Sequence, residues 1–447
     1  MTAYFRKIEY YIKRSETVSR FLYLVKWTLI AFALEKFAMI IVIFLLARVL
    51  GAQDYGRFIL AQGLVNASQI FVVVGAGTML ARYIPKMREE GIQRAVEIIN
   101  LCALLILGTT TAVSIAGIVG ADYVATRILD VPIASLLPYW MLAWLFLIAV
   151  NNLLLTIMLS FEKGRVLGLI ALIGSVMTIV FTPILALRYG LQGVISGFVC
   201  VEAFKAVVLA AIYVRFVKQS GARVLTPARR SDVPLLLSFG LPIFLQSALW
   251  APTIWLAQLI VKTASPDGLV AVGVFGFANN IFGVVVLFSG LTNRAALPIL
   301  SSLQARGTRD ELRKKTWLLS FGQIGVATIL GLPLALAAPY LTSFAGAEFA
   351  ATWPVLVIMI VTGIVVAGQT SLGNYLLVMD RSWYLFVTII PWTLILLAAA
   401  TFLPQHGAYA LAGGLFAASV VRTILFALGC CGLRTPSLRR RGNNVVS

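Results

Sequence analysis

Long apolar runs alternate with short polar stretches along the whole chain. A helix that crosses the hydrocarbon core of a bilayer needs about 20 mainly apolar residues. Counting at that length gives twelve predicted transmembrane helices. They lie near residues 27–49, 58–80, 97–118, 137–159, 167–187, 193–214, 235–261, 271–293, 316–338, 353–377, 384–403 and 409–433. The pattern therefore predicts an all-α polytopic membrane protein.

Composition agrees with this pattern. Hydrophobic residues make up 60% of the chain and charged residues 12%, whereas soluble domains are about 25% charged. Residues 1–25 are polar and basic, and the apolar run after them is long enough to stay in the bilayer, so we expect no cleavable signal sequence. Apolar residues in this segment repeat at the spacing of an interfacial amphipathic helix. A solvated tail explains the same segment equally well.

The 36 Lys and Arg residues are distributed unevenly across the predicted membrane. With a cytoplasmic N-terminus, three of them lie inside spans, five face outside and the rest face the cytoplasm. The five outer residues are Arg48, Arg57, Arg127, Arg188 and Lys262. This distribution follows the positive-inside rule and predicts that both termini are cytoplasmic. It also accounts for the net charge of +19 without a nucleic-acid partner.

Cysteine and histidine are too few and too scattered for a catalytic or metal site. Cys102, Cys200, Cys430 and Cys431 all lie in apolar runs without metal-ligand spacing, and we interpret them as packing residues. The single histidine, His406, lies in a polar turn. We therefore expect no catalytic residues, no cofactor and no metal.

The sequence repeats itself at a register of about 217 residues. Gly56 and Gln62 fall on Gly273 and Asn279. Other pairs near this register are Pro138 with Pro354, Asn152 with Gln369, Gly190 with Gly407 and Lys205 with Arg422. The repeat predicts two six-helix halves of parallel topology.

These halves define the expected domains. The predicted segments are a cytoplasmic basic or amphipathic N-terminus (1–25), a first six-helix bundle (26–214), a cytoplasmic linker (215–234), a second six-helix bundle (235–433) and a cytoplasmic basic tail (434–447).

The stretch RVLGAQDYGRF, residues 48–58, begins with the glycine spacing of a phosphate-binding P-loop. A P-loop needs Lys and then Ser or Thr after its second glycine, but Arg57 and Phe58 follow here. We interpret Gly51 and Gly56 as a tight turn and a close approach between helices. ATP hydrolysis is therefore not expected.

The segment LARVLGAQDYGRFILAQGLVNASQIFVVVGAGTMLARYIPK resembles the first hairpin of Wzx-type polysaccharide and O-antigen flippases. These belong to the multidrug/oligosaccharidyl-lipid/polysaccharide exporter (MOP) superfamily. The similarity in layout extends over the whole chain, including SFGLPIFLQS at the start of span seven and FEKGR at the end of span four.

The resemblance implies a MATE-like fold, with two six-helix bundles around a central cleft lined by spans one, two, seven and eight. It also implies alternating-access transport of an undecaprenyl-diphosphate-linked oligosaccharide, from the cytoplasmic to the outer leaflet of a bacterial inner membrane, for surface polysaccharide synthesis. Membrane lipids, a polysaccharide polymerase and glycosyltransferases are the implied partners. Many relatives carry an acidic residue late in span seven, where this chain has TIWLAQ, residues 253–258.

Span one holds the charges that best suit a diphosphate. Lys26 and Arg48 are separated by about 33 Å of helix, at about 1.5 Å per residue, and so bracket the bilayer. Lys36 then lies near the midplane, where a charge is costly and tends to face a cavity or a partner. We predict that Lys36 contacts the diphosphate. Glu35 is predicted either to tune the charge of Lys36 or to carry a proton. The alternative is a buried structural pair with other spans.

Three further charges lie deep in predicted spans. Glu202 and Lys205 are three residues apart on one helical face, and we expect a structural ion pair. Arg422 has no acidic neighbour in its own helix, so it contacts a lipid headgroup or another span.

Amide side chains gather in the spans expected to line the cleft. Span two carries Gln62, Asn66 and Gln69, span seven carries Gln246, and span eight carries Asn279 and Asn280. Such amides suit sugar hydroxyls, but hydrogen bonding between helices explains any one of them equally well.

Two other functions compete with a flippase. A multidrug or cation antiporter on the same fold needs intramembrane carboxylates, and the deep spans hold two acids against three bases. A glycan polymerase or ligase needs a large outer loop with catalytic residues, whereas the longest outer loop predicted here, about 119–136, is short.

Overall fold

The computed structural model describes residues 16–73, 80, 84, 87, 90–224, 226, 233–306, 309–379 and 381–431. Throughout these residues the chain is helical, with short connections and no strand. The elements are α2 (Glu16–Val73), α4 (Ile92–Val119), α5 (Ala121–Tyr123), the π-helix η1 (Val124–Ile128), α6 (Leu137–Ser160), α7 (Gly164–Gln219), α8 (Val233–Ala264), α9 (Gly268–Arg306), α10 (Arg309–Leu336), α11 (Ala338–Ala345), α12 (Ala347–Ala350), α13 (Trp353–Val378), α14 (Ser382–Phe402), the 3₁₀ helix η3 (Pro404–His406) and α15 (Ala408–Cys431).

Two of the helices hold two membrane crossings each. α2 is broken by non-helical dihedral angles at Gly51 (φ 71°), and α7 is broken at Gly190 (φ 56°). Positive φ favours glycine, because the residue has no Cβ to clash with the backbone. Within the described residues, nine helices are long and apolar enough to cross a membrane, and α2 and α7 are among them. With α8, which covers the seventh predicted span, these helices account for the twelve predicted crossings.

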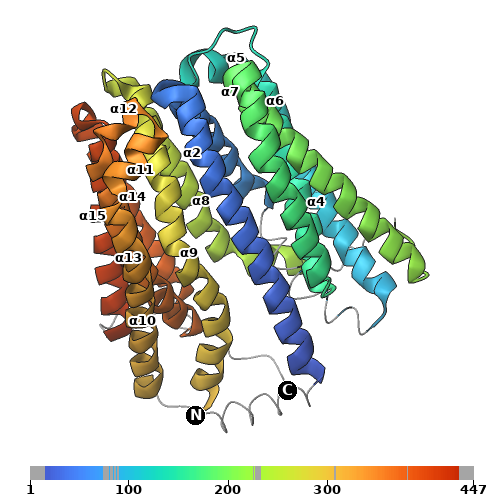
Figure 1. The fold of residues 1–447 in the computed structure, drawn as a ribbon. Helices are drawn as coiled ribbons and strands as arrows, with labels where there is room; N and C mark the ends of the chain where they lie inside the picture. Colours follow the sequence, from blue (N-terminus) through green and yellow to red (C-terminus); the bar gives the residue numbers. More distant parts are fainter. Residues whose placement is uncertain are drawn as a thin grey trace.

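The helices form two bundles that lie side by side (Figure 1). In the first bundle α7 packs against α2 and α6, and α4 packs against α6 and α2. In the second bundle α13 packs against α9, α10 and α15, while α14 packs against α15 and α8. α2 also packs against α8 and α9, and this contact joins the bundles. The predicted all-α architecture with two bundles is confirmed, whereas the exact domain limits stay a prediction.

Some helices extend past the apolar runs that predicted them. α9 continues to Arg306, beyond the predicted limit at residue 293, and α10 begins at Arg309, before the predicted start at residue 316. An apolar run marks the thickness of hydrocarbon that a helix crosses, whereas the backbone hydrogen bonds of the helix continue into the polar region. The lower parts of α2 and α9 diverge in Figure 1.

The internal repeat is visible in the backbone. Gly190 and Gly407, which the repeat pairs, have φ of 56° and 52° and ψ of −135° and −119°. Two glycines in the same unusual conformation at the same place in each half show that the register of about 217 residues is structural. We call the end of the molecule that carries Gly51 the turn end, and the opposite end, where α2 begins and α7 ends, the linker end.

Candidate functional site

A cavity of about 210 Å³ lies between the two bundles, where α2, α8 and α9 meet. Its lining residues are Ile59, Gln62, Gly63, Asn66, Trp250, Ala251, Ile254, Trp255, Gln258, Gly276, Asn279 and Asn280. The lining combines amides with two indole rings, and none of these residues is charged. Such a surface favours a neutral ligand that carries hydrogen-bonding groups.

Four predicted amides come together in this cavity. Gln62 and Asn66 lie one turn apart on α2, so both project from the same face of that helix. Asn279 and Asn280 face them from α9. Because Asn279 occupies the repeat position of Gln62, the two halves contribute matching polar groups to one space. The Nδ2 of Asn280 is already engaged, since it donates to the Gly276 carbonyl at 3.0 Å.

α8 contributes three lining residues that the sequence analysis did not select. Trp255 donates its indole N–H to the Leu60 carbonyl of α2 at 3.2 Å, and Trp250 lies one and a half turns earlier on the helix. The side chain of Gln258 is buried, and its Oε1 has no hydrogen-bond partner among the described residues. The available signal was a single glutamine in an otherwise apolar stretch, 253–258, but a helix that is apolar on all sides does not reveal which face it turns inward.

A small residue on α2 allows α8 to approach. A Cβ atom at Gly63 would lie 2.9 Å from Cδ1 of Trp255 and 3.3 Å from Oε1 of Gln258. Any side chain at this position would displace the indole and the amide from the cavity wall. Gly63 therefore sets the distance between the polar groups of the two bundles.

The remaining predicted amides are not part of the lining. Gln69 is half-buried on α2 but does not line the cavity. The side chain of Gln246 lies outside the described residues. Their proposed contacts with substrate stay predictions.

The predicted bases of span one also lie away from the cavity lining. Lys26, Lys36 and Arg48 are all exposed. The ammonium of Lys36 lies 5.7 Å from the ring of Phe32, and the guanidinium of Arg48 lies 5.8 Å from the ring of Phe344 at the turn end. Their exposure leaves all three side chains accessible to a ligand or a lipid headgroup.

Glu35, whose side chain is 43% exposed, contacts a base of the first bundle. Lys205 Nζ lies 2.8 Å from Oε1 of Glu202 and 3.8 Å from Oε1 of Glu35. Asn151 of α6 donates to Oε2 of Glu202 at 2.6 Å. Both carboxylates therefore share one ammonium, in a network that joins α2, α6 and α7.

The turn end is closed by direct contact between the bundles. A Cβ atom at Gly56 would lie 2.0 Å from the Leu269 carbonyl oxygen, and one at Gly273 would lie 2.3 Å from the Ala52 carbonyl oxygen. These two glycines are partners in the repeat, and they let α2 and α9 touch backbone to backbone. The backbone N–H of Ala52 also donates to Oε2 of Glu348 on α12, at 2.5 Å.

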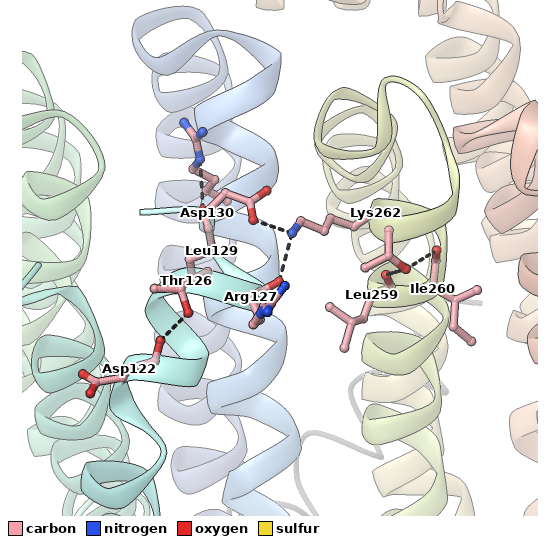
Figure 2. A network of polar contacts seen from close by, with 10 residues as sticks. Asp122, Thr126, Arg127, Leu129, Asp130, Leu259, Ile260 and Lys262 are labelled. Carbon is pink, nitrogen blue, oxygen red and sulfur yellow. Dashed lines mark hydrogen bonds and ion pairs between the residues drawn. The ribbon is translucent and has the colours of Figure 1, made fainter. Parts of the chain in front are cut away.

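A second contact across the bundles involves α8 and the segment after η1, as Figure 2 shows. The ammonium of Lys262 lies 2.7 Å from Oδ1 of Asp130 and donates to the Arg127 carbonyl at 2.9 Å. Asp130 itself has a positive φ of 50°. On the other side of this segment, the Nε of Arg57 donates to the Leu129 carbonyl at 3.0 Å. Residues 127–130 are therefore held by bases from both bundles.

A family model described as "Polysaccharide biosynthesis protein" matches residues 25–304. The chain belongs to this family. Comparison with curated proteins found no match.

Solved structures with the same fold are transporters and flippases. An inward-facing multidrug resistance MATE family transporter of the MOP superfamily superposes with a TM-score of 0.73, at 14% identity over 89% of this chain and 94% of that one. The lipid II flippase MurJ in an inward closed conformation gives 0.65, at 14% identity over 92% and 87%. A MOP superfamily transporter from Pyrococcus furiosus gives 0.64, at 17% identity over 92% and 94%. These superpositions show that the chain shares the fold of these proteins.

Proposed function

We propose that this protein translocates a polyprenyl-diphosphate-linked oligosaccharide across a bacterial inner membrane by alternating access. The observation that carries the proposal is the cavity between the bundles, which is lined by amides from both halves and by two indoles of α8, and which is closed at the turn end. A cavity shared by two bundles changes its access when the bundles rock against each other. Its position suits a site that is exposed to each side in turn.

The cavity chemistry fits a glycan better than a cation. Amide groups both donate and accept hydrogen bonds, as sugar hydroxyls do. Aromatic rings supply the apolar surface that most small-molecule sites present around a few polar groups. A multidrug or cation antiporter remains the alternative, but it would require a carboxylate, and none is present among the residues that line the cavity.

The proposed orientation places the turn end outside and the linker end in the cytoplasm, because the bases of the sequence follow the positive-inside rule in that arrangement. Closure at the turn end then corresponds to a state that receives substrate from the cytoplasmic side. Gln53 at the turn end and Gln219 at the linker end are exposed. A membrane-impermeant thiol reagent should label Gln53→Cys, and not Gln219→Cys, in intact cells of a strain whose chain lacks its native cysteines.

The first test removes the matched amides of the two bundles. A double variant, Gln62→Ala with Asn279→Ala, loses at least two hydrogen bonds to the glycan at about 0.5–1.5 kcal/mol each. We expect about a tenfold slower flipping of a labelled lipid-linked oligosaccharide in proteoliposomes. The measurement is the fraction of glycan that an external glycosidase can reach over time.

Asn152→Ala is the matched control, because Asn152 is an exposed amide on α6 that does not line the cavity. It should flip at the wild-type rate. Flipping by the double variant at the wild-type rate would contradict the role of the cavity. Export of an organic cation by wild-type vesicles, with no flipping, would instead favour the antiporter.

The second test concerns the proposed anion contact of span one. Lys36 is exposed near the middle of its span, and the neighbouring Glu35 forms its ion pair with Lys205. Lys36→Ala should abolish flipping without loss of folded protein, whereas Lys36→Arg should keep part of it, because the positive charge is retained. Wild-type flipping by Lys36→Ala in the same vesicles would show that this charge does not serve the substrate.

A further inference from the structure

Arg422 on α15 is a buried cation in the second bundle. Its side chain is 5% exposed. Its guanidinium lies 5.3 Å from the ring of Trp250 and 5.1 Å from the ring of Phe426. The Nε of Arg422 has no hydrogen-bond partner among the described residues. Aromatic faces attract a guanidinium but accept no strong hydrogen bond from it.

The described helices that pack most closely on α15 offer Arg422 no carboxylate. α15 packs against α8, α9, α13, α14 and η3. None of these elements contains Asp or Glu, and neither does α15 itself. An ionised group in the interior normally has a partner of opposite charge, because desolvation of an unpaired ion is costly. These helices therefore provide no counter-ion for Arg422, whereas a buried structural cation normally has one.

Other donors near this guanidinium also lack acceptors. The indole of Trp392 stacks on Trp250 with ring centroids 4.3 Å apart, and its Nε1 has no hydrogen-bond partner among the described residues. The hydroxyl of Ser419, one turn before Arg422 on α15, is buried and likewise has none there. Two of these donors, the guanidinium of Arg422 and the indole of Trp392, therefore belong to side chains that contact the ring of Trp250. An oxyanion, with several acceptor oxygens and negative charge, complements this set.

The position of Trp250 connects this cluster to the cavity. Its indole lines the cavity between the bundles and is also the ring that Arg422 contacts. The indole is only partly buried. Trp250 is therefore the residue that lies between the cavity and the guanidinium of Arg422.

We propose that Arg422 binds a phosphate or diphosphate group in the second bundle and is reached from the cavity past Trp250. The inference deepens the proposed function, on which it rests for the source of the anion: the diphosphate of the transported lipid. Amides and indoles of the cavity would hold the glycan, and Arg422 would hold the charge that the cavity wall itself does not neutralise.

The test begins with inorganic pyrophosphate and the purified protein in detergent. Pyrophosphate should raise the thermal unfolding midpoint of the wild type by several degrees, because a ligand that binds only the native state stabilises it. Arg422→Met should show no rise with pyrophosphate. Arg422→Lys should show a smaller rise than the wild type, because it keeps the charge but loses the planar fork of donors.

The same variant separates an anion site from a packing role. If Arg422 serves an anion, Arg422→Met without pyrophosphate should unfold at or above the wild-type midpoint, since an unpaired charge is replaced by an apolar chain of similar length. A lower midpoint in Arg422→Met, or an undiminished response to pyrophosphate, would overturn the proposal. Lys163→Met is the matched control, because the exposed Lys163 lies 4.8 Å from the ring of Phe216 in the first bundle. That control should respond to pyrophosphate as the wild type does.

A competition experiment identifies the source of the anion. A polyprenyl diphosphate in the micelle should displace pyrophosphate, and it should do so in the wild type and not in Arg422→Met. Binding of pyrophosphate without displacement by the lipid would overturn the assignment to the lipid headgroup. Flipping assays test the proposed function independently of this binding measurement. An Arg422-dependent response in a protein that flips no oligosaccharide would refute the proposed function alone, and flipping that Arg422→Met leaves intact would refute the inference alone.

Discussion

Lys205 and Arg422 occupy corresponding positions in the two bundles, yet their surroundings are opposite. Lys205 shares the carboxylates of Glu202 and Glu35. Within the part of the chain that the structure describes, the guanidinium of Arg422 lies against the rings of Trp250 and Phe426, and the helices that pack on α15 contain no Asp or Glu. The repeat has therefore kept a cation at the same place and changed its electrostatic partners. The first bundle pairs Lys205 with carboxylates of its own helices, whereas Arg422 in the second bundle lies against aromatic rings.

The contact between the bundles at the turn end, formed around Gly56 and Gly273, is called the seam here, and its two halves are alike. Gly56 and Gly273 also correspond in the repeat, and each packs against the backbone of the opposite bundle. Here both halves need the same residue, because the contact is mutual and any Cβ on either side would clash. Symmetric positions are thus kept alike where the halves touch each other and diverge where each half faces its own interior.

The largest effect should come from the cation of the first bundle. Lys205→Met leaves Glu202 and Glu35 without their shared partner. Removal of one partner from a buried ion pair costs about 3–5 kcal/mol, and because Glu202 is 17% exposed and Glu35 43% exposed we expect a loss near the lower end of that range. The thermal unfolding midpoint in detergent should therefore fall strongly. A triple variant that adds Glu202→Gln and Glu35→Gln should recover most of the loss. The contrast between the bundles would disappear if Lys205→Met were as stable as the wild type.

A smaller effect should come from the seam. Gly56→Ala places a Cβ against the Leu269 carbonyl, and overpacking of this kind costs about 1–3 kcal/mol. The bundles should separate at the turn end, so a thiol reagent added from that end should label Asn66→Cys faster. Gly273→Ala should behave like Gly56→Ala.

Gly283→Ala on α9 is the control for the seam, because no atom lies within 4 Å of its added Cβ. It should be neutral or slightly stabilising, since alanine favours a helix. Different outcomes for Gly56→Ala and Gly273→Ala would break the symmetry argued for the seam.

The smallest effect should come from the ion pair across the turn end. Asp130 is 43% exposed and the side chain of Lys262 is 8% exposed, so water reaches the pair from the carboxylate side. Lys262→Gln should cost about 1 kcal/mol, the upper end of the usual range for an exposed pair. Labelling of Asn66→Cys from the turn end should increase slightly. High salt should increase labelling in the wild type and have little further effect in Lys262→Gln, because salt screens the pair. Lys315→Gln, which breaks an exposed pair with Glu311 far from the seam, should leave labelling unchanged.

Much of the fold could be predicted from sequence because a bilayer imposes a length and a composition on every crossing. The apolar runs gave the spans, and Gly51 was recognisable as a turn between two of them. Four amides of the cavity were also predictable, since Gln62 and Asn66 share a helical face and the repeat supplies Asn279 opposite. Each of these inferences uses spacing within a helix or a fixed register, and both are local properties.

Rotation of the helices about their own axes was decided by the tertiary structure alone. α8 is apolar nearly all round, so nothing in its pattern indicated that Trp250, Trp255 and Gln258 face the partner bundle. Nor could spacing within span one show that Glu35 points to Lys205, more than 150 residues away, and not to Lys36. In a bilayer every helix face can be apolar whether it meets lipid or protein, so hydropathy specifies depth but not direction. Packing against neighbouring helices determines the direction, and with it which polar groups meet in the cavity.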